Sequence, residues 1–532
     1  MKATSPASSP PAGSLVPPAG WAAESGNEQI RLTPGFLFLV TLLGAVLRLY
    51  SLTGQSLWVD ELLTWQMIRP GVPAGYLEQL LDSIQGPLYM AVAWPLIRLQ
   101  DSALMLRLPA ALAGIVTVPL FGLAVTRLLG GRAGRLAVLL FALNPFHVWY
   151  SQEGRGYAFL ILFSVLMALA LQPLVSRKGG YRSAVLFALA TAAAVWSNLG
   201  GMFLWAGMGL GVLLFHFPNS RRQWGTMGLA FGAGLLLVLP WLLKAAGIWA
   251  VDRVLPGGAT GEALRGETTF SVFAWPYTMH TFFYGYSLGP SLRELHQPDR
   301  MAFIRGSLPL LLAGMAPVFV GLVGGLFRIN RRRFSLLVWI IVPVAVLTFL
   351  ALRNFKPWNP RYVAMALPWV MALAAFGLSR LPRRAGMAAV VLLTGLTLWS
   401  LGGYYWDGRY AKADVRAAAA FLEETNPEGD PLIVPVVTSV FSYYYKGPAD
   451  VVDTFGLAAL ESAADADAFC DSVLGDMTRA RLVLAREWYF DPQGQLPLAM
   501  SRRGHLRQTM VADGVRVYHW EKGKTAKQGH GN

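Results

Sequence analysis

Long apolar runs recur along this chain and limit its possible folds more than any other feature. Each is as long as the roughly 17 to 25 residues that a helix needs to cross a bilayer, and they lie at 34–51, 107–128, 135–151, 155–175, 182–198, 199–217, 225–249, 303–327, 334–352, 361–380 and 384–403. Hydrophobic residues make up 54% of the 532 positions and charged residues only 14%, a balance that a soluble globule of this length could hardly bury. The sequence therefore predicts a polytopic α-helical membrane protein with about eleven transmembrane helices.

The amino-terminal segment and one shorter apolar run need separate interpretations. Residues 1–33 are rich in Pro, Ser, Ala and Gly, which predicts a disordered cytoplasmic tail. A cleavable signal peptide would need its apolar stretch near Met1, whereas the first run begins only at Pro34, so this run is expected to be a retained membrane helix. Residues 87–99 would form a helix only about 20 Å long, so we expect it to lie at the membrane surface.

Basic residues orient the predicted helices. Clusters without a single acidic residue fall on one side of the membrane, at Arg31, Arg127/Arg132/Arg135, Arg177/Lys178/Arg182, Arg221/Arg222, Arg328/Arg331/Arg332/Arg333 and Arg380/Arg383/Arg384. The positive-inside rule makes this side the cytoplasm. It also explains the net charge of +15 better than nucleic-acid binding would, so no nucleic-acid partner is expected. We predict a multi-pass protein of the cell (inner) membrane with its amino end inside and its carboxyl end outside.

This orientation places four segments on the outer face: the loop 52–106, the turn around Glu153, the loop 250–302, and residues 404–532. The last of these has a soluble composition, with a helix expected at KADVRAAAAFLEE and strands at PLIVPVV and RLVLA. We expect a transmembrane domain over 34–403 and a small extracytoplasmic α/β domain over 404–532. The single cysteine, Cys470, excludes an intramolecular disulfide and a multi-Cys metal site.

Polar residues that could carry chemistry gather in the outer segments. Asp60 and Glu61 follow the first span in SLWVDELLTW, where they could be a catalytic carboxylate pair or, equally, a helix N-cap followed by an acidic first turn. Ionisable residues recur at three further outward junctions, namely Glu153/Arg155, Arg293/Glu294/His296 and Arg353/Lys356/Arg361. The cations could bind a substrate phosphate, or lipid headgroups by snorkelling.

A carboxylate, several cations and many aromatic residues on one face match glycosyl transfer from a lipid phosphate. The acceptor hydroxyl must lose a proton as it attacks the anomeric carbon, which calls for a general base. The departing polyprenyl phosphate gains negative charge, which Arg or Lys would stabilise. A single displacement of this kind inverts the anomeric centre.

Six ordered stretches resemble the GT-C glycosyltransferases, specifically the bacterial family-39 branch related to protein O-mannosyltransferases and the aminoarabinose transferase. They are SLWVDE, GPLY, the stretch from LRLPAALAG to SQEGRGYA, SLGPSLRELH, NPRYVAMALP and YAKADVRAAAAFL, and they span about residues 34 to 425. The resemblance implies a GT-C fold and a hexosyl or pentosyl transferase that uses a polyprenyl-phosphate sugar. Its extracytoplasmic acceptor (a lipid, a glycan or a protein) is left open.

The resemblance also assigns roles by position. It makes Asp60 the catalytic base and Glu61 its partner. It places Glu153 and Arg155 near the donor phosphate, with Arg361 and, more weakly, Lys356 as phosphate ligands. Further outer-loop candidates are Tyr89, Arg293 and His296.

The chain departs from the family pattern at two places. Many relatives have His-Pro where this chain has Gln85-Gly86, and Thr-His or similar where it has Ser197-Asn198. The loss of both histidines suggests an altered acceptor or weaker metal use. We predict no required cofactor, although Asp60, Glu61 and Glu153 could share a divalent cation with the donor phosphate.

Two other function classes compete with a transferase. A lipid-linked-sugar translocase or transporter would be expected to carry ionisable residues near the membrane midplane, but here they gather at the outer ends of spans. A structural anchor for the outer domain would not require charged outward junctions.

Overall fold

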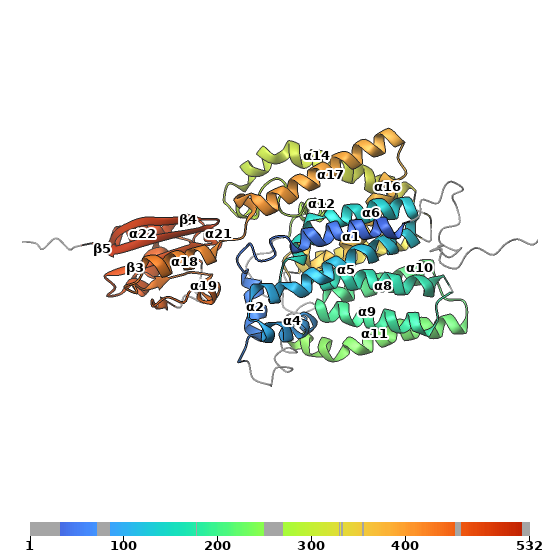
Figure 1. Cartoon of the computed structure of the whole chain (residues 1–532), viewed down its shortest axis with the longest axis horizontal. Helices are drawn as coiled ribbons and strands as arrows, with labels where there is room; N and C mark the ends of the chain where they lie inside the picture. Colours follow the sequence, from blue (N-terminus) through green and yellow to red (C-terminus); the bar gives the residue numbers. More distant parts are fainter. Residues whose placement is uncertain are drawn as a thin grey trace, which may run out of the picture.

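The computed structural model describes residues 32–71, 86–176, 178–248, 270–328, 330, 333–353, 356–452 and 459–523. The predicted tail 1–33, except its last two residues, lies outside the described residues, as do Gln85 and four residues of the basic clusters, Arg31, Arg177, Arg331 and Arg332. Figure 1 shows a bundle of roughly parallel and antiparallel helices with a smaller α/β domain at one end.

The bundle helices follow the predicted apolar runs. They are α1 (Pro34–Leu49), α5 (Ala103–Leu129), α6 (Gly131–Leu143), α7 (Pro145–Ser151), α8 (Tyr157–Val175), α9 (Tyr181–Ser197), α10 (Gly200–Phe215), α11 (Arg221–Ile248), α14 (Arg300–Phe327), α15 (Ser335–Leu352), η2 (Pro360–Ala366), α16 (Leu367–Leu378) and α17 (Arg383–Trp406). By length and composition, seven segments of the described chain could cross a membrane, and α1, α9 and α10 are apolar but shorter. The chain is therefore a multi-pass membrane protein, while eleven crossings remain a prediction.

The run predicted as one span over 135–151 is two helices. Asn144 ends α6 and caps α7, because its side-chain oxygen accepts the His147 backbone N–H at 2.8 Å while its amide donates to the Phe282 carbonyl at 2.7 Å. Pro145 then occupies the first position of α7, where its missing N–H costs nothing. The turn after α7 lies at the end of the bundle that adjoins the smaller domain, because its Glu153 is 3.9 Å from Lys412 Nζ.

Two helices of the first outer loop, α2 (Val59–Ile68) and α4 (Pro87–Leu99), lie at this same end (Figure 1). The short apolar run over 87–99 is helical with the bounds predicted. The long outer loop contributes α12 (Ala274–Tyr284) and α13 (Leu292–Leu295), and its residues 250–269 lie outside the described chain.

The terminal domain is built on a five-stranded mixed sheet. It comprises α18 (Val415–Thr425), β1 (Leu432–Ile433), α19 (Thr438–Tyr444), β2 (Val451–Val452), α20 (Ala463–Leu474), β3 (Arg479–Ala485), α21 (Glu487–Phe490), α22 (Gln495–Arg503), β4 (Gly504–Ala512) and β5 (Val515–Lys522). The strand order is β2-β1-β3-β5-β4, in which β1 runs parallel to β2 and β3, and β5 runs antiparallel to β3 and β4. Helices α18 and α19 cover one hydrophobic cluster, and α20 and α22 cover another.

The predicted elements of this domain are present with different lengths. The helix expected from Lys412 begins at Val415, because Asp414 caps it by accepting the Ala417 N–H at 3.1 Å. The strand RLVLA is part of β3, but PLIVPVV supplies only the two residues of β1. Prolines on both sides of β1 lack the N–H that would extend the ladder.

Candidate functional site

The Asp60 carboxylate stands in the first turn of α2 and forms an ion pair with Arg361, from the start of η2. Asp60 Oδ2 lies 2.7 Å from Arg361 Nη1, and about a fifth of each side chain is exposed (22% and 21%). Burial raises the pKa of Asp60, but Arg361 and then Arg155 lower it by more, so its pKa lies below the usual range. The structure thus brings Asp60, Arg155 and Arg361 together, although Asp60 and Arg361 are 301 positions apart in the sequence.

Glu61, the next residue, is fully buried and its oxygens are occupied by donors. Arg107 donates from Nε and Nη2 at 2.7 and 2.8 Å, and the Gly154 N–H donates at 2.8 Å. The Trp58 N–H donates at 2.9 Å, and Lys412 Nζ lies 3.4 Å away. Burial raises the pKa of Glu61, but Arg107 and Lys412 lower it by more. These contacts tie the first outer loop to the bundle and to the terminal domain.

One of the two interpretations of the acidic pair is therefore wrong in detail. The N-cap of α2 is Trp58, not Asp60, and Glu61 is the residue whose side chain accepts the N-cap N–H. Asp60 is thereby left without a capping role, with its carboxylate directed at Arg361.

Glu153 is a buried acid in the turn between α7 and α8. Its Oε2 accepts from Trp149 Nε1 at 3.1 Å and lies 3.9 Å from Lys412 Nζ. Its Oε1 is buried and has no hydrogen-bond partner among the described residues. Burial raises the pKa of Glu153 by more than Lys412 lowers it. Glu153 is therefore the carboxyl of this site that most readily holds a proton.

Arg155 and Lys356 lie close to the Asp60–Arg361 pair. Arg155 Nη1 donates to the Asp60 carbonyl at 2.9 Å, which fixes the first turn of α2. Lys356 Nζ lies 4.5 Å from the centre of the Tyr362 ring, and the Arg361 guanidinium lies 5.2 Å from the same ring. Arg361 and Arg155 thus both lie at Asp60, and Lys356 and Arg361 share contact with the Tyr362 ring, which gives this end of the bundle cations that could bind a phosphate.

The three other outer-loop candidates occupy different surroundings. Tyr89 is buried in α4 and donates to the Leu106 carbonyl at 2.6 Å, so it braces the outer-loop helices. His296 stacks on Trp488 of the terminal domain at 4.0 Å between ring centres. Arg293 lines a cavity at the same interface.

This cavity, of about 510 Å³, lies between the bundle end and the terminal domain. Aromatic residues Trp58, Trp149 and Tyr286 line it from the bundle, and Arg486 and Trp488 line it from the terminal domain. Trp58 is two residues from Asp60 and Trp149 bonds Glu153, so the cavity adjoins the carboxylates. A polar molecule with ring faces and negative charge would fit such a lining.

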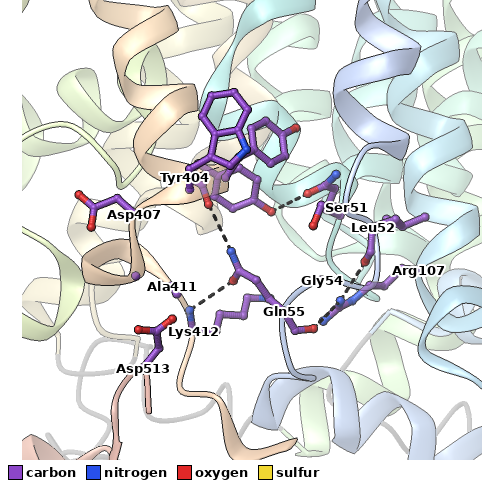
Figure 2. Close-up of a pocket in the computed structure, with 14 residues that line it drawn as sticks. Ser51, Leu52, Gly54, Gln55, Arg107, Tyr404, Asp407, Ala411, Lys412 and Asp513 are labelled. Atoms are coloured by element: carbon purple, nitrogen blue, oxygen red, sulfur yellow. Dashed lines mark hydrogen bonds between the residues drawn. The ribbon is translucent and has the colours of Figure 1, made fainter. Parts of the chain in front are cut away.

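A smaller cavity of about 210 Å³ is lined mainly by residues that follow α1 and by residues at and after the end of α17, together with Arg107 and Asp513 (Figure 2). Gln55 spans it, donating to the Tyr404 carbonyl at 3.4 Å and accepting from the Lys412 N–H at 3.3 Å. Arg107 and Lys412 line its wall, and Lys412 lines the larger cavity too. Lys412 therefore borders both cavities, as does Ala411, and its Nζ lies near Glu61 and Glu153.

Sequence reasoning missed Arg107, Lys412 and Arg486. Arg107 was overlooked because it is the first residue of the predicted span 107–128, where a charged side chain at the outer end is expected to snorkel to the membrane surface. Lys412 stood in the quoted stretch YAKAD without an assigned role, and only the fold brings it to Glu61. Arg486 follows a strand that gives no hint of contact with the first outer loop, yet it lies over Trp58.

The two stretches that depart from the family pattern meet in space. A side chain at Gly86 would begin 2.3 Å from the Trp196 carbonyl oxygen and 2.4 Å from backbone atoms of Ser197. Only glycine fits this approach, which couples the two departures physically.

Metal binding is left untested by the geometry. Within the ranges that the structure describes, no group of three or more His, Cys, Asp and Glu side chains could hold a metal ion. The expectation that no metal is required therefore stays a prediction.

Comparison with solved structures identifies the fold. The crystal structure of ArnT from Cupriavidus metallidurans in the apo state aligns with a TM-score of 0.54 at 16% identity, covering 91% of this chain and 98% of ArnT. The structure of the same protein bound to undecaprenyl phosphate aligns with a TM-score of 0.50, with the same identity and coverage. No family model and no curated protein matches the chain. The chain thus has the GT-C type of fold expected from its sequence.

Proposed function

We propose that the protein is an inverting glycosyltransferase of the family-39-like branch. It moves a hexosyl or pentosyl group from a polyprenyl-phosphate donor to a hydroxyl of an extracytoplasmic lipid, glycan or protein. The observation that carries this proposal is the Asp60–Arg361 pair, a carboxylate 2.7 Å from a guanidinium beside an aromatic cavity. It is supported by a fold shared with a protein whose structure holds undecaprenyl phosphate.

Asp60 is the general base in this proposal. The acceptor oxygen bonds to the anomeric carbon as the bond from that carbon to the phosphate oxygen breaks, and the hydroxyl proton passes to Asp60. Asp60 suits this role because its side chain is partly exposed and ionised, whereas Glu61 is enclosed by donors. Glu61 then acts by positioning α2 and Arg107.

Arg361 stabilises the departing polyprenyl phosphate. Its Nε is buried without a hydrogen-bond partner among the described residues, so a phosphate could use donors beyond the one engaged by Asp60. A bound phosphate would draw the guanidinium from Asp60 and so raise the pKa of that carboxyl, making it a better base once the donor is in place. Arg155 and Lys356 add positive charge on the same side.

The test is donor consumption by the purified protein in nanodiscs, followed by mass spectrometry over a panel of polyprenyl-phosphate sugars. We expect sugar-dependent release of polyprenyl phosphate by the wild type and by Glu424→Gln, which alters an exposed carboxylate far along the sequence in α18. Asp60→Asn should bind the donor and release none. Release at an unchanged rate by Asp60→Asn would remove it as the base.

The same variants separate a transferase from a translocase. A translocase would move a fluorescent polyprenyl-phosphate sugar across liposomes in both wild type and Asp60→Asn, without releasing polyprenyl phosphate. This pattern would contradict the proposal.

A further inference from the structure

One turn of the terminal domain contacts the first outer loop of the bundle, through Trp58, and the long outer loop, through His296. Strand β3 ends at Ala485, and Arg486 then takes a left-handed conformation with φ 57° and ψ 41°, which L residues other than glycine rarely adopt. The next two residues hold this turn in place, because Glu487 forms an ion pair with Arg516 and Trp488 stacks on His296. The backbone strain persists because neighbouring contacts fix the turn, a pattern that is common at functional sites.

The turn delivers the Arg486 guanidinium to the larger cavity. Its carbon lies 5.0 Å from the centre of the Trp58 ring and 4.9 Å from that of Trp488, so it is held between an indole from each domain. Burial lowers the pKa of Arg486, and of the ionisable groups around it Asp60 acts most strongly, ahead of Tyr489 and then Arg361, so it lies within electrostatic reach of the Asp60–Arg361 pair.

Arg486 differs from three of the four other cations that line the same cavity, and from the fourth, Arg293, in having a buried donor without a partner among the described residues. Arg409, Lys412 and Arg516 each lie within ion-pair distance of a glutamate. No carboxylate of the described chain pairs with Arg486, and its Nε is buried without a hydrogen-bond partner there. The Arg486 guanidinium is thus partly desolvated, has a donor without a partner at Nε, and is oriented by the Trp58 and Trp488 rings. These features preorganise it to donate paired hydrogen bonds to an anion.

We propose that Arg486 is an anion-binding residue of the candidate site, which the terminal domain contributes, and that its ligand is a phosphate group of a substrate. The inference rests on the proposed function for the identity of the substrates. The phosphate could belong to the lipid donor or to an acceptor that enters from the aqueous side. The terminal domain is then part of the site itself.

Binding assays distinguish the two sources. The probes are undecaprenyl phosphate in nanodiscs, with undecaprenol as its neutral counterpart, and glucose 6-phosphate, whose phosphate is not on the anomeric carbon, with methyl glucoside as its neutral counterpart. Arg486→Gln should weaken binding of one phosphate probe by about tenfold to a hundredfold, the usual cost of one charged hydrogen-bond partner. Loss for undecaprenyl phosphate assigns Arg486 to the donor, and loss for glucose 6-phosphate assigns it to the acceptor.

The matched control is Arg409→Gln, which removes a cation of the same cavity that is already paired with Glu294. It should leave both affinities within about twofold. Wild-type affinity of Arg486→Gln for both phosphate probes, or a wild type that binds each neutral counterpart as tightly as its phosphate, would overturn the inference.

A second variant separates binding from folding. Arg486→Gly relieves the left-handed backbone while removing the guanidinium, so we expect an unchanged or higher Tm together with the same loss of phosphate binding. A lower Tm combined with retained phosphate affinity would show that Arg486 only stabilises the interface between the bundle and the terminal domain. Because these readouts are binding and Tm, they are independent of whether the donor panel shows turnover.

Discussion

Four ionisable side chains, Glu61, Arg107, Glu153 and Lys412, are buried together beside Asp60. Their two acids differ in how fully they are satisfied, since Glu61 accepts from several donors and Glu153 has one oxygen without a partner among the described residues. Burial opposes ionisation of both, and only Glu61 has enough cation contact to overcome it.

Glutamine at these two positions should therefore affect stability in opposite ways. The pKa of Glu61 is lowered by folding, so its stabilising effect is present above its unfolded pKa and lost as pH falls through the folded value. At pH 7, Glu61→Gln leaves Arg107 without its counterion and should lower stability by about 3–5 kcal/mol. The measurement is thermal unfolding in detergent.

Glu153→Gln serves as the isosteric comparison. The pKa of Glu153 is raised by folding, so the ionised carboxylate costs stability above its folded pKa, and the neutral amide removes that cost. The variant should have an equal or higher Tm at pH 7, and its amide oxygen can still accept from Trp149. A Tm drop matching that of Glu61→Gln would show that Glu153 is ionised and needed as a counterion.

The Asp60–Arg361 pair predicts a shift in the pH profile. In the proposed mechanism Asp60 must be ionised to act as the base, so activity should fall as pH drops through the pKa of Asp60, which lies below the ordinary value of about 4. Arg361→Gln removes the nearest cation, and the acid limb of kcat/KM should move upward by about one pH unit or more. Arg361→Lys, which keeps the charge, should show a smaller shift. If the acid limb of kcat/KM does not move in Arg361→Gln, the ionisation that it reports is not that of Asp60.

The roles within the acidic pair could not be read from sequence. Neighbouring residues on a helix point about 100° apart, so Asp60 and Glu61 face different surroundings. Which face is buried depends on Arg107 and Lys412, and Lys412 lies 351 positions away from Glu61. The residues alone could locate the pair as a site but could not separate a base from a structural anchor, and only the family resemblance made Asp60 the expected base.

At the level of elements, apolar periodicity and length predicted the helices well. The helix over 87–99 has the predicted bounds, and β3 lies where RLVLA indicated a strand. The break at Asn144 was missed although Asn-Pro is a turn signal, because the apolar run on both sides outweighed it. The length of β1 was overestimated, because the apolar residues of PLIVPVV continue beyond the two residues that pair in the sheet.

Helix α2 is shared between the two parts of the molecule. Leu62 is 1% exposed and belongs to a hydrophobic cluster of the terminal domain, with Val415, Ala418 and Phe441, while Leu63 is 44% exposed. Leu62→Ala should destabilise the domain contact by about 2–5 kcal/mol, and Leu63→Ala should have little effect. We expect faster proteolysis of the terminal domain, and lower transferase activity, only in Leu62→Ala. Equal behaviour of the two variants would show that α2 is held by the bundle alone.

At the scale of the whole molecule, the terminal domain supplies part of the candidate site. Arg486 and Trp488 line the larger cavity, and the linker residue Lys412 reaches Glu61 and Glu153. The sequence indicated a separate soluble domain, but contacts across hundreds of positions arise only from how the two parts pack. The placement of the site at their junction was therefore beyond sequence reasoning.

The predicted orientation can be tested by labelling introduced cysteines, because the chain has only one native cysteine, Cys470, and it is buried. Burial raises the pKa of the Cys470 thiol to about 11, so the wild type should resist maleimide and provide the background. Glu424 in α18 and Arg132 at the start of α6 are both exposed. Helix α18 belongs to the terminal domain at one end of the bundle, whereas the predicted orientation places Arg132 on the cytoplasmic side. An impermeant maleimide should label Glu424→Cys in spheroplasts and Arg132→Cys only after permeabilisation. The reverse pattern would place the carboxylates and the cavity in the cytoplasm, where an acceptor outside the cell could not reach Asp60.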